Sequence, residues 1–317
     1  MTGDPSICGS GPARDPSGNP GSAIPRARAL GQSLWLDNIT RDLLDSGTVA
    51  RYIRELSITG LTSNLSIFDA AIGGGTSYDE AIRAKCAQGK SGEALFTELA
   101  LEDLRRAADL FAPVFAETQG VDGCVSMEIS PLLASDTHGS LAAAQQIHAQ
   151  AARPNLFVKI PGTPESLPAI EEAIFAGVPI NVTLLFSCAQ YLAAAEAYLR
   201  GIERRVQAGL DAQVASVFVS RWDAAVKDKV PPVLHNRLGL AVCGEVYAAL
   251  QALLRSPRWQ ALRAAGVRPQ RVLWASTGTK DPVALQLQRG GAEAFVKSWR
   301  QLLQRIADKS VGLGAML

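Results

Sequence analysis

Near the middle of the 317-residue chain stands the run Leu156-Phe157-Val158-Lys159-Ile160-Pro161-Gly162-Thr163. Its apolar residues predict a strand that ends at Pro161-Gly162, and Thr163 with Pro164 predicts the cap and first turn of a helix. Lys159 then lies at the mouth of the strand. If both faces of the strand are buried, as in parallel sheets, desolvation disfavours the ammonium, and the neutral amine can attack a carbonyl. The structural alternative is a lysine that extends past the strand end to solvent.

Short apolar runs alternate with longer helical patterns along the chain, which is typical of a parallel sheet with helical crossovers. The predicted strands are 34–37, 58–64, 124–130, 156–160, 179–184, 214–220 and 271–276, and helices are predicted at 48–56, 94–117, 140–152, 187–208 and 235–254. The expected fold class is therefore α/β. Residues 1–30 are crowded with Gly, Pro and Ser and predict a disordered extension, so we expect a single domain over 31–317.

Polar residues recur on one parity of these strands, close to the C-terminal ends. In a closed parallel barrel that parity faces the interior, and chemistry gathers at the C-terminal ends of the strands. The residues placed in this way are Asp37, Asn64, Glu128, Lys159, Asn181, Thr183, Ser216 and Ser276. Each has an ordinary structural explanation by itself, such as a cap, a turn or an ion pair. A core does not need such groups, because each buried polar atom without a partner costs about 1–3 kcal/mol, so their recurrence indicates a site.

Composition narrows the function classes. A formal net charge of +1 gives no broad electrostatic footprint for nucleic acid or a membrane surface, so an anionic ligand needs a local site. The five cysteines show no paired spacing, which favours reduced thiols over a disulfide framework or a zinc site. The sequence shows no apolar run that we expect to span a bilayer, and no leader, so we expect a cytoplasmic protein.

A lysine among carboxylates and amides, without a metal-ligand cluster or a redox motif, suits imine chemistry on a carbonyl substrate. Attack of Lys159 on a ketone gives a carbinolamine, and Glu128 can protonate its departing hydroxyl, directly or through a water held by Thr183. The iminium then accepts the electrons of a carbon–carbon bond once a base, for which Asp37 is placed, deprotonates the hydroxyl that becomes an aldehyde. The fragment left on the lysine has hydroxyls that three further residues are placed to hold: Asn64, Asn181 and Ser216.

Several motifs resemble a known family. They are Trp35-Leu36-Asp37, Thr62-Ser63-Asn64-Leu65-Ser66-Ile67-Phe68, Val125-Ser126-Met127-Glu128, Phe157-Val158-Lys159-Ile160-Pro161, Asn181-Val182-Thr183-Leu184-Leu185-Phe186-Ser187, Phe218-Val219-Ser220-Arg221 and Trp274-Ala275-Ser276-Thr277-Gly278-Thr279-Lys280. In this order they resemble transaldolase, in particular its longer bacterial branch, from about residue 31 to Pro282 and again over 293–299. The resemblance implies a (β/α)8 barrel without a cofactor. It also implies transfer of a dihydroxyacetone unit from fructose 6-phosphate or sedoheptulose 7-phosphate to an aldose phosphate in the pentose phosphate pathway.

The resemblance also implies a role for each matching position. Lys159 would form the Schiff base, Glu128 and Thr183 would manage the catalytic water, and Asp37 would be the acid/base for bond cleavage. The implied substrate-binding residues are Asn64, Asn181, Ser216, Phe218, Arg221, Ser276 and Lys280, of which Arg221, Ser276 and Lys280 would bind the phosphate. The expected partners are sugar phosphates and not metal, nucleic acid or membrane, and a homo-oligomer is left open.

Two features depart from the family pattern. Members of that branch carry a longer segment, including the eighth strand, between the seventh strand and the final helix. Here Asp281-Pro282 leads to that helix within about ten residues, so we expect the eighth strand to be missing or replaced by residues 283–288. Gly162 stands where we expect alanine, which predicts added backbone freedom beside Lys159. Two alternative functions stay open: a non-catalytic barrel that binds a sugar phosphate or a protein partner, and a class I aldolase that releases free dihydroxyacetone.

Overall fold

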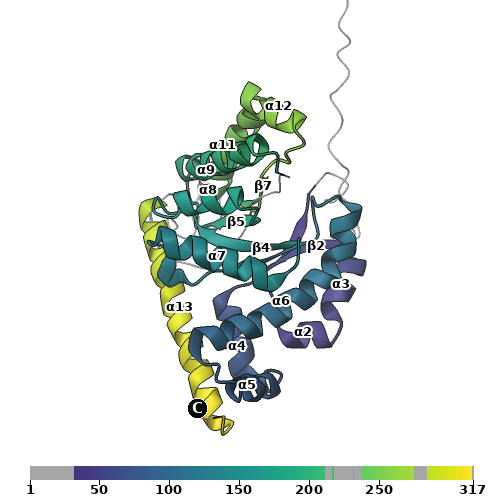
Figure 1. Ribbon diagram of the computed structural model, residues 1–317, viewed down its shortest axis with the longest axis vertical. Coiled ribbons are helices and arrows are strands. Elements are labelled where there is room, and N and C mark those ends of the chain that lie inside the picture. The colour runs from purple at the N-terminus through teal and green to yellow at the C-terminus, as the bar shows by residue number, and fades with distance from the viewer. Residues whose placement is uncertain (1–31, 211–215, 218–230, 232–237, 275–283, 316–317) are drawn as a thin grey trace, which may run out of the picture.

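The computed structural model describes residues 32–210, 216–217, 231, 238–274 and 284–315. Within them, seven strands form one parallel sheet whose order follows the chain (Figure 1). The strands are β1 (Leu34–Leu36), β2 (Ile58–Thr62), β3 (Cys124–Glu128), β4 (Leu156–Pro161), β5 (Ile180–Thr183), β6 (Ser216–Val217) and β7 (Arg271–Val272). Each lies within or one residue beyond a predicted strand, so the α/β class and the parallel sheet are confirmed.

Helices connect the strands and cover one side of the sheet. They are α2 (Arg41–Asp45), α3 (Thr48–Leu56), α4 (Leu65–Gly74), α5 (Asp79–Cys86), α6 (Gly92–Glu117), the 3-10 turn η1 (Pro131–Leu133), α7 (Thr137–Ala151), α8 (Leu167–Phe175), α9 (Cys188–Gln207), α11 (Leu238–Arg255), α12 (Pro257–Ala264) and α13 (Ala284–Gly312). Each helix range predicted from the sequence matches one of them to within three residues at either end. Strand followed by helix, repeated around a sheet of constant direction, is the architecture of a (β/α) barrel.

The predicted parity of the strands is visible in the two faces of the sheet. Residues such as Val125, Val158 and Val182 belong to the large hydrophobic core that the strands share with the helices. The opposite parity carries a separate small cluster in which Cys124 and Phe157 pack with Trp35 and Phe115. The interior of the barrel is therefore apolar at the N-terminal ends of the strands, which leaves its polar residues for the C-terminal ends.

Gly60 explains how the first two strands pack inside the barrel. A Cβ atom at this position would lie 2.3 Å from the indole of Trp35, so only glycine leaves room for that ring on the neighbouring strand. Trp35 and Gly60 are also register partners. The glycine thus lets β1 bring a large side chain into the barrel beside β2.

The helix after β4 begins later than the sequence predicts. α8 starts at Leu167 with Ser166 in the cap position, whereas we expected Thr163 as the cap and Pro164 in the first turn. The Thr163 hydroxyl instead donates to the carbonyl of Ala134 at 2.7 Å and accepts from the amide of Ser166 at 3.3 Å. The Thr163 side chain therefore fixes a turn to the segment after η1, and the helix forms only beyond that turn.

For the eighth strand we expected either its absence or its replacement by residues 283–288, and the replacement is wrong for the residues that the structure describes. Residues 284–288 form the start of α13, a single helix of 29 residues. Among the described residues β1 and β7 are the edges of the sheet, and no described strand lies between them. An alternating pattern in so short a segment fits a helix as well as a strand, and here it continues into the periodicity of α13.

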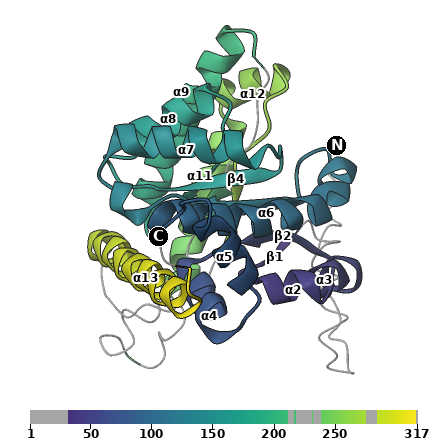
Figure 2. The same ribbon diagram turned by 60° about the horizontal axis from the view of Figure 1, so that its bottom comes forward.

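α13 runs along the molecule beside α4, as Figures 1 and 2 both show. Its C-terminal half is held by charge, because Arg305 pairs with Asp69, and the ammonium of Lys309 pairs with Asp79 at 2.7 Å. The same ammonium donates to the backbone carbonyl of Ile72 at 2.6 Å. α13 also packs on α5, α6 and η1, so it joins elements from separate parts of the chain.

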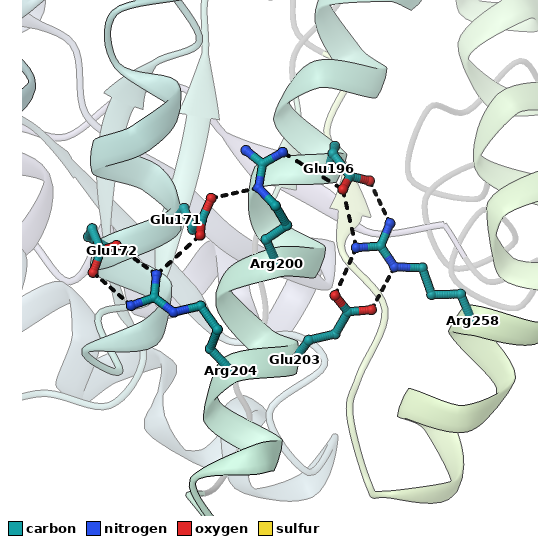
Figure 3. Close-up of polar contacts among 7 residues, drawn as sticks. All are labelled: Glu171, Glu172, Glu196, Arg200, Glu203, Arg204 and Arg258. Atoms are coloured by element: carbon teal, nitrogen blue, oxygen red, sulfur yellow. Dashed lines mark hydrogen bonds and ion pairs between the residues drawn. The ribbon is translucent and has the colours of Figure 1, made fainter.

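A network of arginines and glutamates ties α8, α9 and α12 together on the surface (Figure 3). Arg204 bonds Glu171 and Glu172 of α8, while Arg258 of α12 bonds both oxygens of Glu203 and both of Glu196 on α9. The hydrogen bond from Arg258 lowers the pKa of Glu203 below its ordinary value of 4.5. A carboxyl with a lowered pKa in the fold stabilises the protein above its ordinary pKa, and this contribution is lost as the pH falls through the lowered value.

We expect Arg258→Met to lower the free energy of unfolding by about 1 kcal/mol at pH 7, the upper range for pairs this exposed. The loss should shrink at high salt, and it should shrink again as the pH falls below about 4.5 and through the lowered pKa of Glu203. Urea unfolding of both proteins at about pH 7 and about pH 3.5 measures this. If the free energies of unfolding of the wild type and Arg258→Met differ by the same amount at both pH values, the charges of the network do not contribute to stability.

One described helix, α11, is long and apolar enough to cross a membrane when only its length and composition are considered. This corrects the expectation that no such run exists. The same criterion is passed by helices in the core of soluble proteins, so it is weak evidence. α11 lies against α9 and α12 in the structure.

Candidate active site

Lys159 lies at the C-terminal end of β4, with every residue of the strand buried. Lys159 is only 5% exposed, which excludes the alternative that its side chain extends to solvent. The amine donates to the carbonyl of Ser63 at 3.2 Å and lies 3.9 Å from a carboxylate oxygen of Glu128. The lysine thus lies inside the barrel among polar groups, on the parity that the sequence predicts.

Glu128 and Asn181 flank Lys159 on the two neighbouring strands and are its register partners. Glu128 is 6% exposed and Asn181 is fully buried. The amide nitrogen of Asn181 donates to the hydroxyl of Ser126 at 2.9 Å. The amide oxygen of Asn181 has no hydrogen-bond partner among the described residues, so it is an acceptor held ready beside the lysine.

Asp37 follows β1, two strands away from the strand of Glu128. It is exposed, and one of its carboxylate oxygens accepts a 2.6 Å hydrogen bond from the hydroxyl of Thr62 on β2. Thr62 is buried and is the register partner of Ser126. The aspartate is therefore oriented by a buried hydroxyl at the C-terminal end of the barrel while the residue itself remains accessible, as suits a group that exchanges protons.

Asn64 caps the helix that follows β2. Its side-chain oxygen accepts from the amide of Ser66 at 2.9 Å and from the hydroxyl of Ser66 at 2.8 Å. A cap is among the ordinary structural explanations given above for such residues. The cap and a role in binding are compatible, because a cap that uses Oδ1 leaves contact with a ligand to the amide nitrogen.

The backbone at the ends of β4 and β5 is fixed tightly around the lysine. Thr183 is 5% exposed and pairs with Pro161, and its carbonyl accepts a 2.7 Å hydrogen bond from the amide of Gly162. The next residue, Leu184, has a φ of +60°, a left-handed conformation that costs a leucine roughly 1–2 kcal/mol. We call these two strand ends, Pro161 with Gly162 and Thr183 with Leu184, the β4–β5 rim.

The structure gives a different reason for Gly162 than backbone freedom. A Cβ atom there would lie 2.3 Å from a methyl of Leu185 and 3.0 Å from one of Val182, both of them buried side chains. The alanine expected from the family pattern would have to displace Leu185. In this chain, therefore, Gly162 leaves the space that the side chains of Leu185 and Val182 fill beside the β4–β5 rim.

We expect Gly162→Ala to lower the free energy of unfolding by about 1–3 kcal/mol, the usual cost of overpacking a filled core. Gly244→Ala is the matched control, because Gly244 lies within α11 and a Cβ atom there has nothing within 4 Å. That control should be neutral or stabilising, since alanine favours a helix over glycine by about 0.5–1 kcal/mol. Thermal unfolding of the two variants compares them. If Gly162→Ala is as stable as the wild type, Leu185 can move freely and the packing explanation fails.

A cavity of about 400 Å³ opens between α6 and α7 and reaches the end of β3. Its lining includes Glu128 and Ser130 at the strand end, Gln146 of α7 and Trp299 of α13. The volume is enough for several waters. Within the described part of the chain, no three His, Cys, Asp or Glu side chains gather in a way that could hold a metal ion.

The structure thus brings together Lys159, Glu128, Asn181 and Thr183, and it places Asp37 and Asn64 at the same end of neighbouring strands. Ser216 of β6 is the register partner of Asn181. The predicted residues Phe218, Arg221, Ser276 and Lys280 lie outside the described residues. Their roles, and those of the residues described above, stay predictions.

Sequence reasoning missed Thr62 and Ser126, which orient Asp37 and Asn181. Both share the interior parity of their strands with predicted residues, Thr62 with Asn64 and Ser126 with Glu128. That parity could have identified them. No sequence signal pointed to the carbonyl of Ser63 as the acceptor for Lys159, because a backbone contact across strands leaves no trace in residue type.

The fold and the site together define a (β/α) barrel that holds a buried lysine between a carboxylate and an amide at the C-terminal end of its sheet. Comparison with known proteins gives the family. Residues 34–283 match the model of the family described as transaldolase/fructose-6-phosphate aldolase, and the chain belongs to this family.

Curated relatives agree with the family model. The chain is 40% identical over 273 residues to a transaldolase of Trichodesmium erythraeum, a match that covers 80% of this chain and 72% of the relative. It is 42% identical over 273 residues to a transaldolase of Thermobifida fusca, covering 83% of this chain and 74% of the relative. It is 42% identical over 264 residues to a transaldolase of Acidothermus cellulolyticus, covering 80% of this chain and 71% of the relative. The resemblance found in the motifs is therefore confirmed, and with it the barrel class.

Proposed function

We propose that this protein is a transaldolase, which transfers a dihydroxyacetone unit from a ketose phosphate to an aldose phosphate through a Schiff base on Lys159. The observation that carries the proposal is the pair of Lys159 and Glu128, both more than nine-tenths buried, with amine and carboxylate 3.9 Å apart. The family match and the relatives named transaldolase support the same reaction. They do not favour a non-catalytic barrel or an aldolase that releases dihydroxyacetone.

The first half of the reaction builds the imine. The amine of Lys159 adds to the ketone carbon of fructose 6-phosphate or sedoheptulose 7-phosphate, and a proton moves from nitrogen to oxygen to give the carbinolamine. Glu128 supplies a proton to the hydroxyl, which leaves as water and gives the iminium. Thr183, on the strand next to that of Lys159, offers that water a hydrogen-bond partner.

The second half breaks and remakes a carbon–carbon bond. Asp37 takes the proton of the hydroxyl two carbons from the iminium carbon, that oxygen becomes the aldehyde of the departing aldose phosphate, and the bond electrons form the enamine. The enamine adds to the aldehyde of the acceptor, whose oxygen takes the proton back from Asp37. Addition of water to the new iminium then frees Lys159. The side-chain oxygen of Asn181 and the side-chain nitrogen of Asn64 are proposed to bind the hydroxyls of the three-carbon fragment that remains on Lys159.

The phosphate end of the substrate is assigned by the resemblance alone, to Arg221, Ser276 and Lys280. Ser216 and Phe218 complete the proposed substrate-binding residues. The wider proposal is a single domain over 31–317, cytoplasmic as the scattered cysteines favour, acting in the pentose phosphate pathway on sugar phosphates and not on nucleic acid or membrane. Self-association is compatible with it.

The proposal is tested by incubating the protein with fructose 6-phosphate and sodium borohydride and digesting it for mass spectrometry. We expect a reduced dihydroxyacetone adduct on the peptide that contains Lys159. With erythrose 4-phosphate present, we expect a seven-carbon ketose phosphate as product. Free dihydroxyacetone as the main product, with or without the acceptor, would make the protein an aldolase instead, and no adduct with either donor would overturn the proposal.

A further inference from the structure

Gln288 lies near the start of α13 and contacts the β4–β5 rim directly. Its side chain is buried, with the residue 4% exposed. The amide nitrogen donates to the carbonyl of Gly162 at 2.8 Å and to the carbonyl of Leu184 at 3.1 Å. Gly162 is three residues beyond Lys159, and Leu184 directly follows Thr183, so one side chain bridges the ends of both strands.

These two carbonyls need a donor. The backbone leaves the sheet at Gly162 and Leu184, and Leu184 holds a left-handed conformation that a leucine adopts only where its surroundings enforce it. A buried carbonyl without a partner costs about 1–3 kcal/mol. The amide of Gln288 therefore stabilises a strained turn that would relax if the donor were removed.

The apolar neighbours of Gln288 support the same contact. Ala292 and Phe295 of α13 pack against Leu184 and Phe186. Gln288, Ala292 and Phe295 are four and three residues apart, so they lie on one face of the helix. That face of α13 is seated on the segment that follows β5.

We propose that Gln288 is a positioning residue for the reaction, which holds the β4–β5 rim so that the Lys159 amine and the Thr183 hydroxyl keep their mutual geometry. In this chain, therefore, the side-chain amide of Gln288 on α13 supplies hydrogen-bond donors to the β4–β5 rim. Gln288 belongs to the segment for which a substitute strand was considered. The inference rests on the proposed function. A displacement of about 1 Å at reacting groups can cost about 100-fold in rate, so two hydrogen bonds to the backbone beside them can control turnover.

The competing explanation is that Gln288 only anchors α13. Lys309 offers a matched control, because it also donates to backbone carbonyls, those of Ile72 and Gly75, from the opposite half of the same helix. Lys309→Met removes that anchor among α4 and α5, away from the β4–β5 rim. A role of Gln288 in anchoring alone would give Gln288→Met and Lys309→Met the same effect on turnover.

The experiment compares Gln288→Met, Gln288→Asn and Lys309→Met with the wild type, each assayed at the same interval below its own melting temperature. Methionine keeps the volume and removes both donors, and asparagine keeps the amide on a shorter side chain. We expect kcat to fall about 10- to 100-fold in Gln288→Met with KM within about twofold, and to fall less in Gln288→Asn. Lys309→Met should keep kcat within about twofold. If Gln288→Met does not fold, Gln288→Asn carries the comparison.

Hydrogen exchange gives a readout that does not need turnover. The amide of Gly162, which donates to Thr183, should exchange faster in Gln288→Met than in Lys309→Met. Equal kcat and equal exchange in those two variants would overturn the inference. A wild type without transfer or trapping would overturn the proposed function, and faster exchange at Gly162 would in that case still establish that Gln288 holds the rim.

Discussion

Lys159→Met is expected to abolish both the borohydride adduct and the transfer of the three-carbon unit, so that the rate falls to that measured without protein. The thioether has no nucleophilic nitrogen, and the rest of the chemistry depends on the imine as the acceptor of electrons. The variant also removes the nitrogen that lies 3.9 Å from Glu128 inside the barrel. The measurement is the rate of ketose phosphate formation together with the mass of the peptide that contains residue 159.

Lys159→Arg is the matched variant. It retains a basic group of similar length near Glu128 and Ser63, but a guanidinium does not form a stable imine. We expect this variant to be as inactive as Lys159→Met while keeping more of the stability, because the buried carboxylate keeps a cation beside it. Transfer by either variant above the rate without protein would show that the reaction proceeds without this lysine.

Glu128→Gln is expected to lower kcat by about 100- to 10,000-fold, the range that a positioned general acid or base contributes. Glutamine has the same shape as glutamate and cannot donate the proton that expels the carbinolamine hydroxyl. Unlike Lys159→Met, this variant should still yield the adduct on Lys159 after long incubation with borohydride, because the nucleophile is intact. The measurement is a time course of trapping beside steady-state turnover.

Glu172→Gln is the control for Glu128→Gln. Glu172 is bonded to Arg204 on the surface between α8 and α9, so the same chemical change there should leave kcat unaltered (Figure 3). If Glu128→Gln traps the adduct at the rate of the wild type but turns over slowly, Glu128 acts after imine formation, and its proposed role in dehydration is wrong.

Much of the fold could be predicted because the signals are local. β3, β4 and β5 are short apolar runs with a polar residue on alternate positions, and a helix pattern follows each of them. The parity that follows from the pleat placed Glu128, Lys159 and Asn181 on one face, and the register of the three strands then puts them beside one another. These three site residues could be predicted from the sequence because the geometry of a strand fixes which side chains share a face.

The rest depended on contacts between residues far apart in sequence. The late start of α8 follows from the bond between Thr163 and Ala134, and the need for Gly162 follows from where Leu185 packs. Gln288 looked like part of a substitute strand, since its segment alternates apolar and polar residues over a length that suits either structure. Its contact with the rim could be found only from the structure.

The reach of α13 has a consequence for how the protein folds. Its bonds join residues 126 positions apart at Gly162, 236 apart at Asp69 and 237 apart at Ile72. Contacts that close such long loops form late, because their entropic cost is met only after the intervening chain is ordered. A refolding chain should therefore regain its helical content before it regains turnover, with the interval between the two set by the docking of one helix.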